Sequence, residues 1–272
     1  MTAENWLYLI IGLVIFNYLF STVLDFINGK NWRTEIPPVM KDFYPEDKYL
    51  KAKNYSKEKG KVSLISSTLS TLITLLFLVF GGYGWLDNFI SLYYDIPFLK
   101  SGIFFLVLFI LSDFISIPFS CYNTFVIEEK YGFNKTTVKT FVLDKIKGYL
   151  LTLIIGGVLL FGAIYIVSLL ENGFWLWLWL SLSFIMLLVN MFYADLIVPI
   201  FNKLTPLEAG SLREKIESYT KKVGYSLKNI YIIDGSKRST KANAFFSGLG
   251  PRKTIALYDT LVEKHTEEEL VA

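Results

Sequence analysis

Five long apolar stretches constrain this 272-residue chain more than any other feature of its sequence. Four of them contain no charged residue: 5–24, 62–86, 148–170 and 173–194. The fifth, 101–119, contains only Asp113. A helix needs about 20 apolar residues to cross the hydrocarbon layer of a membrane. We therefore predict five transmembrane helices, at about 5–26, 62–86, 100–119, 147–170 and 173–198.

The basic residues predict which side of the membrane each part of the chain occupies. Region 25–61 carries nine Lys and Arg, region 120–147 carries five and the region after 201 carries twelve, which leaves only Lys100 elsewhere. Five spans place these three regions on one side, and the positive-inside rule makes that side the cytoplasm. We predict a multi-pass protein of the bacterial inner membrane or the endoplasmic reticulum, with its N-terminus outside and its C-terminal domain cytoplasmic. The net charge of +3 gives no reason to expect a nucleic-acid partner.

Residues 201–272 are predicted to form a domain of a different kind. Thr205–Glu208 has the pattern of a capping box and predicts a helix that begins at Pro206 and ends at Gly224. Short apolar runs then predict strands at 229–233, 242–247 and 254–258, followed by a short helix at 259–265. A second capping box, Thr266–Glu269, opens a helix too short to be stable alone, so we expect the natural protein to continue beyond Ala272.

The predicted fold class is therefore mainly α. A multi-pass transmembrane helical domain (residues 1–200) precedes the incomplete start of an α+β domain (residues 201–272).

Few side chains are available to bind a metal or to act as acid and base. With one cysteine, Cys121, and one histidine, His265, the chain cannot build a four-cysteine or a two-histidine zinc site. We therefore predict no metal site within residues 1–272. Glu128 and Glu129 form a lone acidic pair, which is more typical of a salt bridge or a solvated face than of catalysis. Cys121 has no histidine nearby in the sequence to activate it.

Four aspartates lie within or beside the predicted spans, where ionisable groups are functional candidates. Asp25 and Asp144 are at cytoplasmic helix ends and are interpreted as contacts to headgroups and water. Asp195 closes the fifth span and is predicted to be interfacial. Asp113 lies inside the third span and either faces a hydrated cavity or pairs with a lysine such as Lys147.

The segment Ala242–Ser247 is the most informative part of the C-terminal region. Basic residues precede it and two glycines follow it, so this strand could lie at an open edge of a sheet. An extended peptide can add to such an edge through main-chain hydrogen bonds. The alternative is an internal strand of a hairpin, and the pattern alone does not separate the two.

The chain resembles the integral-membrane CAAX prenyl proteases, a family of zinc metalloendopeptidases, over essentially its whole length. The resemblance consists of several long motifs that occur in the same order as in that family. They are Tyr49–Lys53 with Tyr55, Tyr122–Asn134, Pro199–Leu207, Asp234–Ser239, Asn243–Phe246, Leu257–Leu261 and Glu267–Leu270.

The resemblance implies a protease that processes prenylated C-terminal peptides. In that family, the helix corresponding to Glu268–Ala272 continues into H-E-x-x-H, which binds zinc. This motif is absent here, so the resemblance implies zinc in the full-length protein, but no catalytic residue and no zinc within residues 1–272, which alone are predicted to be inactive. It also implies that Asn243, Ala244 and Phe245 bind the substrate peptide, and that the spans enclose a chamber in which Asp113 or Asn190 faces water.

Two alternatives remain at this point. One is a membrane quality-control metalloprotease without prenyl specificity, which differs only in its substrates. The other is a membrane transporter or scaffold whose tail binds a partner. A transporter typically contains polar, interrupted helices and an inverted repeat, and the sequence shows no such repeat.

Overall fold

The computed structural model describes residues 2–33, 35–37, 44–170 and 172–271. The chain divides into two compact units, Met1–Gly132 and Phe133–Ala272. Each unit contains long apolar helices, and only the second contains a sheet among the described residues. The units are described in turn.

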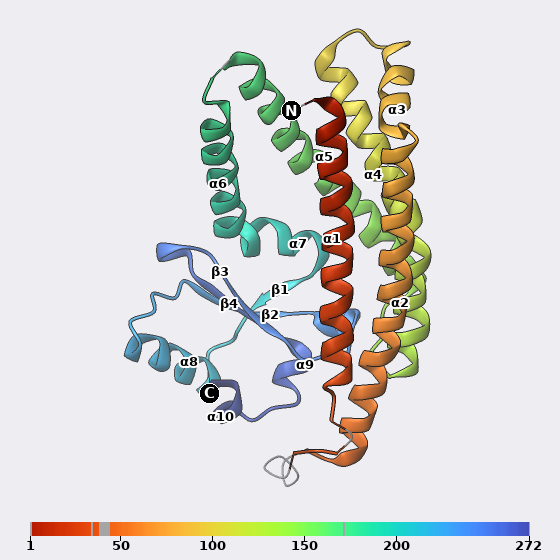
Figure 1. The fold of residues 1–272 in the computed structure, drawn as a ribbon. Coiled ribbons are helices and arrows are strands. Elements are labelled where there is room, and N and C mark those ends of the chain that lie inside the picture. The colour runs from red at the N-terminus through yellow and green to blue at the C-terminus, as the bar shows by residue number, and fades with distance from the viewer. Residues whose placement is uncertain (1, 34, 38–43, 171, 272) are drawn as a thin grey trace. The chain divides into compact units, whose positions relative to one another are not determined.

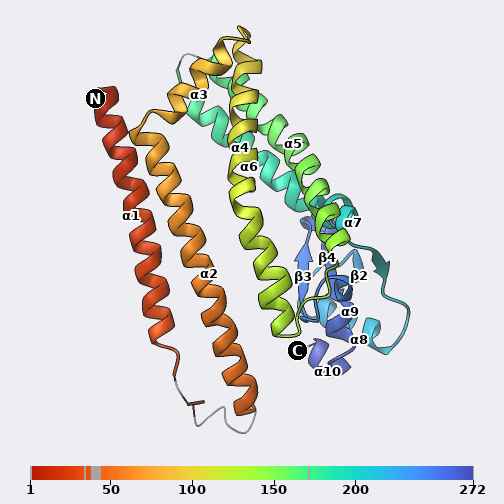
Figure 2. The same cartoon turned by 90° about the vertical axis from the view of Figure 1, so that its right-hand side faces the viewer.

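The first unit is built from long helices. Helices α1 and α2 run side by side (Figures 1 and 2), and the hydroxyl groups of Tyr18 and Thr68 form a 2.7 Å hydrogen bond between them. The helices are α1 (Ala3–Lys30), α2 (Glu46–Val79), α3 (Gly82–Ser91) and α4 (Pro97–Tyr122), and the π-helix η2 (Asn123–Glu128) continues α4.

The predicted span at 62–86 differs from the helix that forms. Helix α2 begins at Glu46, well before the apolar stretch, because Lys, Glu and Ala are strong helix formers. It ends at Val79, and Gly81 then adopts the left-handed conformation, with φ of 68°. Residues 82–86 therefore belong to the separate helix α3.

The second unit begins with two more long helices and continues into the sheet domain. Thr137 caps the first of them, its side-chain oxygen accepting a 3.1 Å hydrogen bond from the Thr140 amide. The elements are α5 (Val138–Leu169), α6 (Phe174–Phe192), the π-helix η3 (Tyr193–Ile197) and α7 (Val198–Phe201).

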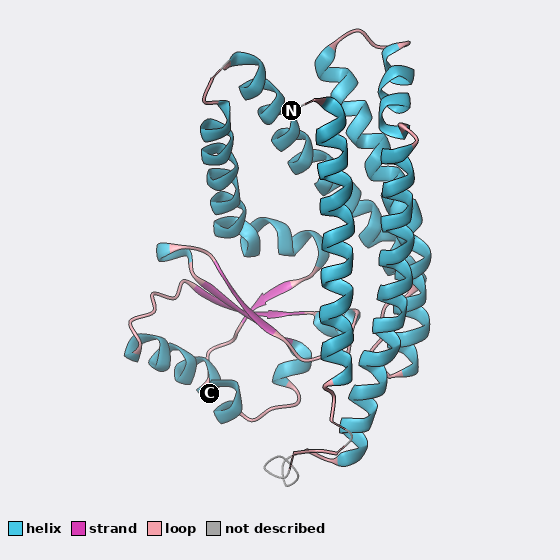
Figure 3. Ribbon diagram, in the orientation of Figure 1, coloured by secondary structure: helices cyan, strands magenta, loops and turns pink. Residues whose placement is uncertain are grey.

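A four-stranded sheet, shown in magenta in Figure 3, forms the centre of the C-terminal domain. The strand order is β1-β2-β4-β3, with β2 and β4 parallel and the other two pairs antiparallel. Ile216, Ile230, Ile255 and Leu257 form its core. The elements are β1 (Leu204–Pro206), α8 (Ser211–Lys222), β2 (Asn229–Ile233), η4 (Gly235–Lys237), β3 (Ala244–Ser247), η5 (Gly250–Arg252), β4 (Thr254–Tyr258), α9 (Asp259–Val262) and α10 (Glu267–Val271).

Most of the predicted elements of this domain are confirmed. The strands at 229–233 and 254–258 have the predicted bounds, whereas β3 begins at Ala244 and α9 ends at Val262. The capping box predicted at Thr205–Glu208 is wrong. Thr205 and Pro206 belong to strand β1, and the helix starts only at Ser211. The second capping box is confirmed: the Thr266 amide donates to Glu269 Oε2 (2.8 Å), and the Glu269 amide donates to Thr266 Oγ1 (3.4 Å).

Five helical segments are long and apolar enough to cross a membrane: Ala3–Lys30, Glu46–Val79, Pro97–Glu128, Val138–Leu169 and Phe174–Phe201. In each, at most 11% of the most apolar 18-residue window is buried inside the protein. Exposed apolar surface of this extent needs a lipid environment. The predicted fold class, a multi-pass helical membrane domain followed by an α+β region, is confirmed.

Candidate functional site

Strand β3 lies at one edge of the sheet, because its only partner among the described residues is β4. The amide of Tyr258 donates to the carbonyl oxygen of Asn243 over 3.0 Å, which sets the phase of the ladder. Backbone groups alternate direction along an antiparallel strand. The N–H and C=O groups of Ala244 and Phe246 therefore point away from β4, toward the edge.

The outward-facing amide of Ala244 already has a local partner. The side-chain Oδ1 of Asn243 accepts a 2.9 Å hydrogen bond from it. Asn243 and Ala244 are both exposed, so an incoming carbonyl group could replace this side-chain oxygen without unfolding the strand. The Phe246 ring is 71% exposed and makes an edge contact with Tyr225 at a centroid distance of 6.0 Å.

The π-helix η3 packs against the face of β3 that carries Phe245, which is the face opposite to the exposed Phe246 side chain. Its Tyr193 ring packs against Phe245 with a centroid distance of 5.8 Å and an interplanar angle of 74°. Nearby, Ser247 Oγ donates to the carbonyl oxygen of Asn190 over 3.3 Å. A π-helix widens the turn and is frequent at functional sites. These contacts fix the orientation of β3 while its outer edge stays open.

The loop before β3 is anchored by Arg238. Its Nε and Nη2 donate to the two carboxylate oxygens of Asp144 over 2.7 and 2.8 Å, and Nη2 also donates to the Phe201 carbonyl over 2.7 Å. The hydrogen bonds to Asp144 raise the pKa of Arg238 above its usual value. Asp144 thus has a structural role, as predicted, but its partner is a guanidinium group rather than headgroups and water.

Asp195 lies between two basic side chains of the sheet domain. Its Oδ2 is 3.8 Å from Lys228 Nζ and 3.7 Å from Arg252 Nη1. The Arg252 guanidinium also lies 4.8 Å from the centre of the Phe192 ring. Both long ion pairs are partly exposed, and we assign Asp195 to structure rather than to catalysis.

The acidic pair at 128–129 contributes to a network in the first unit. Glu128 Oε1 accepts a hydrogen bond from the Tyr55 hydroxyl and lies 3.5 Å from Lys59 Nζ. Between Tyr55 and Lys59 on α2, Glu58 binds Lys130 Nζ at 2.6 Å and the Tyr131 hydroxyl at 3.1 Å. The salt-bridge interpretation of Glu128 is therefore supported.

The other singled-out polar residues have local contacts. Asp113 Oδ1 accepts a 3.3 Å hydrogen bond from Ser116 Oγ. Lys147 Nζ donates to the carbonyl of Ile200 over 2.7 Å. Cys121 is a half-buried thiol, and His265 Nδ1 lies 3.6 Å from Glu269 Oε2 on the next helical turn.

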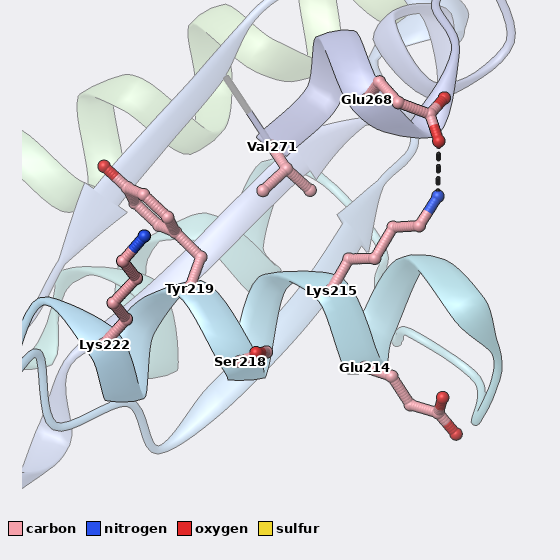
Figure 4. Close-up of a pocket in the computed structure, with 7 residues that line it drawn as sticks. All are labelled: Glu214, Lys215, Ser218, Tyr219, Lys222, Glu268 and Val271. Atoms are coloured by element: carbon pink, nitrogen blue, oxygen red, sulfur yellow. Dashed lines mark hydrogen bonds and ion pairs between the residues drawn. The ribbon is translucent and has the colours of Figure 1, made fainter.

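A shallow pocket of about 660 Å³ lies between α8 and α10 (Figure 4). Lys215 Nζ crosses it to bind Glu267 at 2.8 Å and Glu268 at 2.6 Å. Tyr219 and Val271 provide its apolar side. The ion pairs of Lys215 hold α10 against α8, and the pocket has no catalytic constellation.

The donor groups of the described residues are too scattered to form a zinc site. Among the described residues, no three His, Cys, Asp or Glu side chains lie close enough to hold a metal ion. His265 has one carboxylate neighbour, and Cys121 belongs to the other compact unit. The residues that the structure describes therefore do not fit a catalytic zinc site.

The assignment of Asn243, Ala244 and Phe245 to peptide binding stays a prediction, and sequence reasoning missed two residues that hold this part of the domain in place. Tyr193 and Arg238 are separated from their partners by 52 and 94 positions, respectively. Sequence patterns such as turn glycines and helix caps describe neighbouring residues, so they do not predict contacts between residues this far apart in the chain. The only local signal was the aromatic and basic character of the segments in which they lie.

Comparison with known proteins gives consistent matches along the chain. Residues 27–203 match the model of the CAAX prenyl protease N-terminal region with five membrane helices, and residues 206–272 match peptidase family M48. A probable CAAX prenyl protease 1 of Schizosaccharomyces pombe is 38% identical over 88% of this chain and 53% of its own length. The Saccharomyces cerevisiae CAAX prenyl protease 1 is 33% identical over 98% of this chain and 62% of its own length.

A solved structure has the same fold. The crystal structure of S. mikatae Ste24p superposes with a TM-score of 0.89 at 33% sequence identity. The match covers 97% of this chain and 64% of that chain. The chain therefore spans about half to two thirds of the length of these relatives.

Proposed function

The chain belongs to the CAAX prenyl protease family of M48 metallopeptidases, and from this we propose that residues 1–272 are the membrane and substrate-docking portion of a zinc metalloendopeptidase. The whole protein would cleave CAAX-type, prenylated C-terminal peptides. The relatives named as CAAX prenyl proteases support this substrate class. The bilayer is the second partner, since the substrate is itself lipid-anchored.

We further propose that residues 1–200 form the membrane domain and that residues 201–272 form the first part of a cytoplasmic protease domain. The distribution of 26 of the 27 basic residues on one side of the predicted spans supports this orientation. Lys100, the remaining one, forms a 2.9 Å ion pair with Asp87, which reduces its weight as a topology signal.

The observation that carries the proposal is the open edge of β3. Its outward N–H and C=O groups can pair with an extended peptide, which would continue the sheet by one strand. In this arrangement Ala244 offers main-chain hydrogen bonds, because the Asn243 carbonyl is already bonded to the Tyr258 amide, and the Asn243 side chain yields its place on the Ala244 amide to the peptide carbonyl. Phe245 contributes indirectly, because its packing on Tyr193 fixes the strand.

The substitution Ala244→Pro tests this edge. Proline removes the outward-facing N–H but leaves the hydrogen bond between Tyr258 and Asn243 intact. We expect the affinity of the 272-residue chain for a fluorescent farnesylated peptide to fall about tenfold or more. Ala244→Ser keeps the N–H and is the matched control, with affinity close to that of the wild type. Equal affinities for the Pro and Ser variants would contradict docking at β3.

We also propose that residues 1–272 alone hold no catalytic zinc and have no peptidase activity. The single histidine and the absence of a cluster of three donor side chains among the described residues support this. Elemental mass spectrometry of the purified chain should find zinc far below one ion per molecule. A stoichiometric zinc content would show that His265 has carboxylate partners that complete a site.

A further inference from the structure

A groove of about 650 Å³ lies in the first unit, between helix α2 and the end of α4 with its continuation η2. The arrangement of α4 explains why space remains there. Pro118 lacks the amide that would donate within the helix, and the π-helix η2 begins five residues later, at Asn123. These two irregularities interrupt regular packing along the side of α4 that borders the groove.

The polarity of the groove changes in one direction along both of its walls. On α2, Glu58 and Lys61 are followed immediately by Val62 and Ile65, where the charge-free part of the helix begins. On the facing wall, the apolar Phe119 precedes Lys130. The two chain segments run in opposite directions, so the charged residues of both walls lie at the same end.

This position coincides with the boundary between hydrocarbon and headgroups. The last charged residue of α2 before its 18 uncharged residues Val62–Val79 is Lys61. A groove with a charged end at this depth and an apolar end beside the acyl chains has the polarity of a glycerophospholipid. Water or a soluble metabolite would leave the apolar side chains of Val62 and Ile65 without an apolar partner.

The charge of the groove indicates which headgroup it prefers. Glu58 is neutralised by Lys130 at 2.6 Å and also accepts the Tyr131 hydroxyl at 3.1 Å. Lys61 has no carboxylate within ion-pair distance among the described residues, although its charge acts on Glu58, and with Lys130 it gives this end two positive charges against one negative charge. The same stretch of α2, residues 46–61, carries six lysines against three acidic residues, which adds a positive field.

We propose that this groove binds one anionic glycerophospholipid. Its phosphate contacts Lys61 and the Lys130 ammonium, and one acyl chain lies along Val62, Ile65 and Phe119. This site is distinct from the sheet edge at β3 and does not depend on the proposed peptidase function. It attaches α2 to α4 through a lipid and thereby stabilises the first unit in an anionic membrane.

The test measures binding of short-chain lipids to the full 272-residue chain in detergent by native mass spectrometry. Dioctanoyl phosphatidylglycerol should bind with one-to-one stoichiometry and more tightly than dioctanoyl phosphatidylcholine. Lys61→Gln should weaken phosphatidylglycerol binding about fivefold, as expected for one basic contact near a membrane surface, and should weaken phosphatidylcholine binding less, because the choline cation offsets the charge of its phosphate. Ile65→Trp, which fills the apolar end, should weaken the binding of both lipids.

Lys57→Gln is the matched control, because Lys57 is an exposed lysine one turn earlier on α2 that does not line the groove. Equal losses for Lys57→Gln and Lys61→Gln would overturn the proposal in favour of a diffuse surface field. Equal affinities of the wild type for the two lipids would also overturn it. Displacement of the lipid by millimolar inorganic phosphate would identify a phosphate site instead.

Discussion

The ion pair between Arg238 and Asp144 gives the sharpest test of how the loop before β3 is held. In Asp144→Ala, the guanidinium group loses both carboxylate hydrogen bonds, of 2.7 and 2.8 Å, and keeps only the Phe201 carbonyl. The segment around Arg238 is also bound to the start of α5, because the Arg238 carbonyl accepts the Lys135 amide over 3.0 Å. The substitution should therefore loosen this whole junction.

The magnitude follows from the partial burial of the pair. The Arg238 and Asp144 side chains are 22% and 25% exposed, between a buried and a surface ion pair. Breaking a fully buried pair costs about 3–5 kcal/mol, whereas an exposed pair contributes about 0–1 kcal/mol. We expect a coupling free energy of about 2 kcal/mol, which corresponds to an approximately 30-fold change in the local opening equilibrium.

Amide hydrogen exchange measures this opening directly. In Asp144→Ala, exchange of the Lys135 amide, which donates to Arg238, should accelerate about 30-fold, while β4 amides stay protected. A double-mutant cycle with Arg238→Ala isolates the pair, and Asp25→Ala removes an exposed carboxylate as a control. A coupling free energy below about 0.5 kcal/mol would refute the reasoning, since the pair would then behave like a surface ion pair.

Two further predictions concern the sheet domain. A Cβ atom at Gly235 would lie 2.1 Å from Cδ1 of Tyr258, so Gly235→Ala should lower the free energy of unfolding by about 1–3 kcal/mol. Gly210→Ala should not lower it, because a Cβ atom at Gly210 would have no atom within 4 Å. Hydrogen bonds from Lys215 hold the pKa values of two α10 glutamates below their usual range. Their contribution is therefore present above the ordinary glutamate pKa of about 4.3 and is lost as the pH falls below it, so the protection factors of the α10 amides, which correct for the intrinsic exchange rate, should fall only at acidic pH.

The sequence predicted the membrane helices well because membrane insertion depends on local composition. An uninterrupted apolar stretch is sufficient to identify a span, but it does not locate the ends of the helix. Helix α2 extends to Glu46 through a basic segment, since its residues favour helix formation in water as well as in lipid. Its early end follows from the left-handed backbone at Gly81, which an apolar count does not detect.

The candidate site was predictable only in part, for a related reason. The run Ala242–Ser247 identified a strand, because a short apolar run and the turn residues that follow it are local signals. Its position at the edge depends on the order β1-β2-β4-β3, which is set by the packing of all four strands. The supporting contact between Tyr193 and Phe245 requires the π-helix η3, and no sequence pattern used here predicts such a helix.

The two capping boxes show how tertiary structure decides between equal local signals. At Thr266, the reciprocal hydrogen bonds with Glu269 form as the motif predicts. At Thr205, the same pattern competes with the outer edge of β2, where Leu204–Pro206 pairs with Tyr231–Ile233 and the Leu207 amide donates to the Ile230 carbonyl over 2.9 Å. Pro206 is compatible with either outcome, because an edge strand tolerates a missing N–H as well as the first turn of a helix does. The strand forms because it supplies hydrogen-bond partners to the backbone groups of β2, which contains buried residues. Leaving those groups unpaired would cost more free energy than the helix would gain from one additional turn.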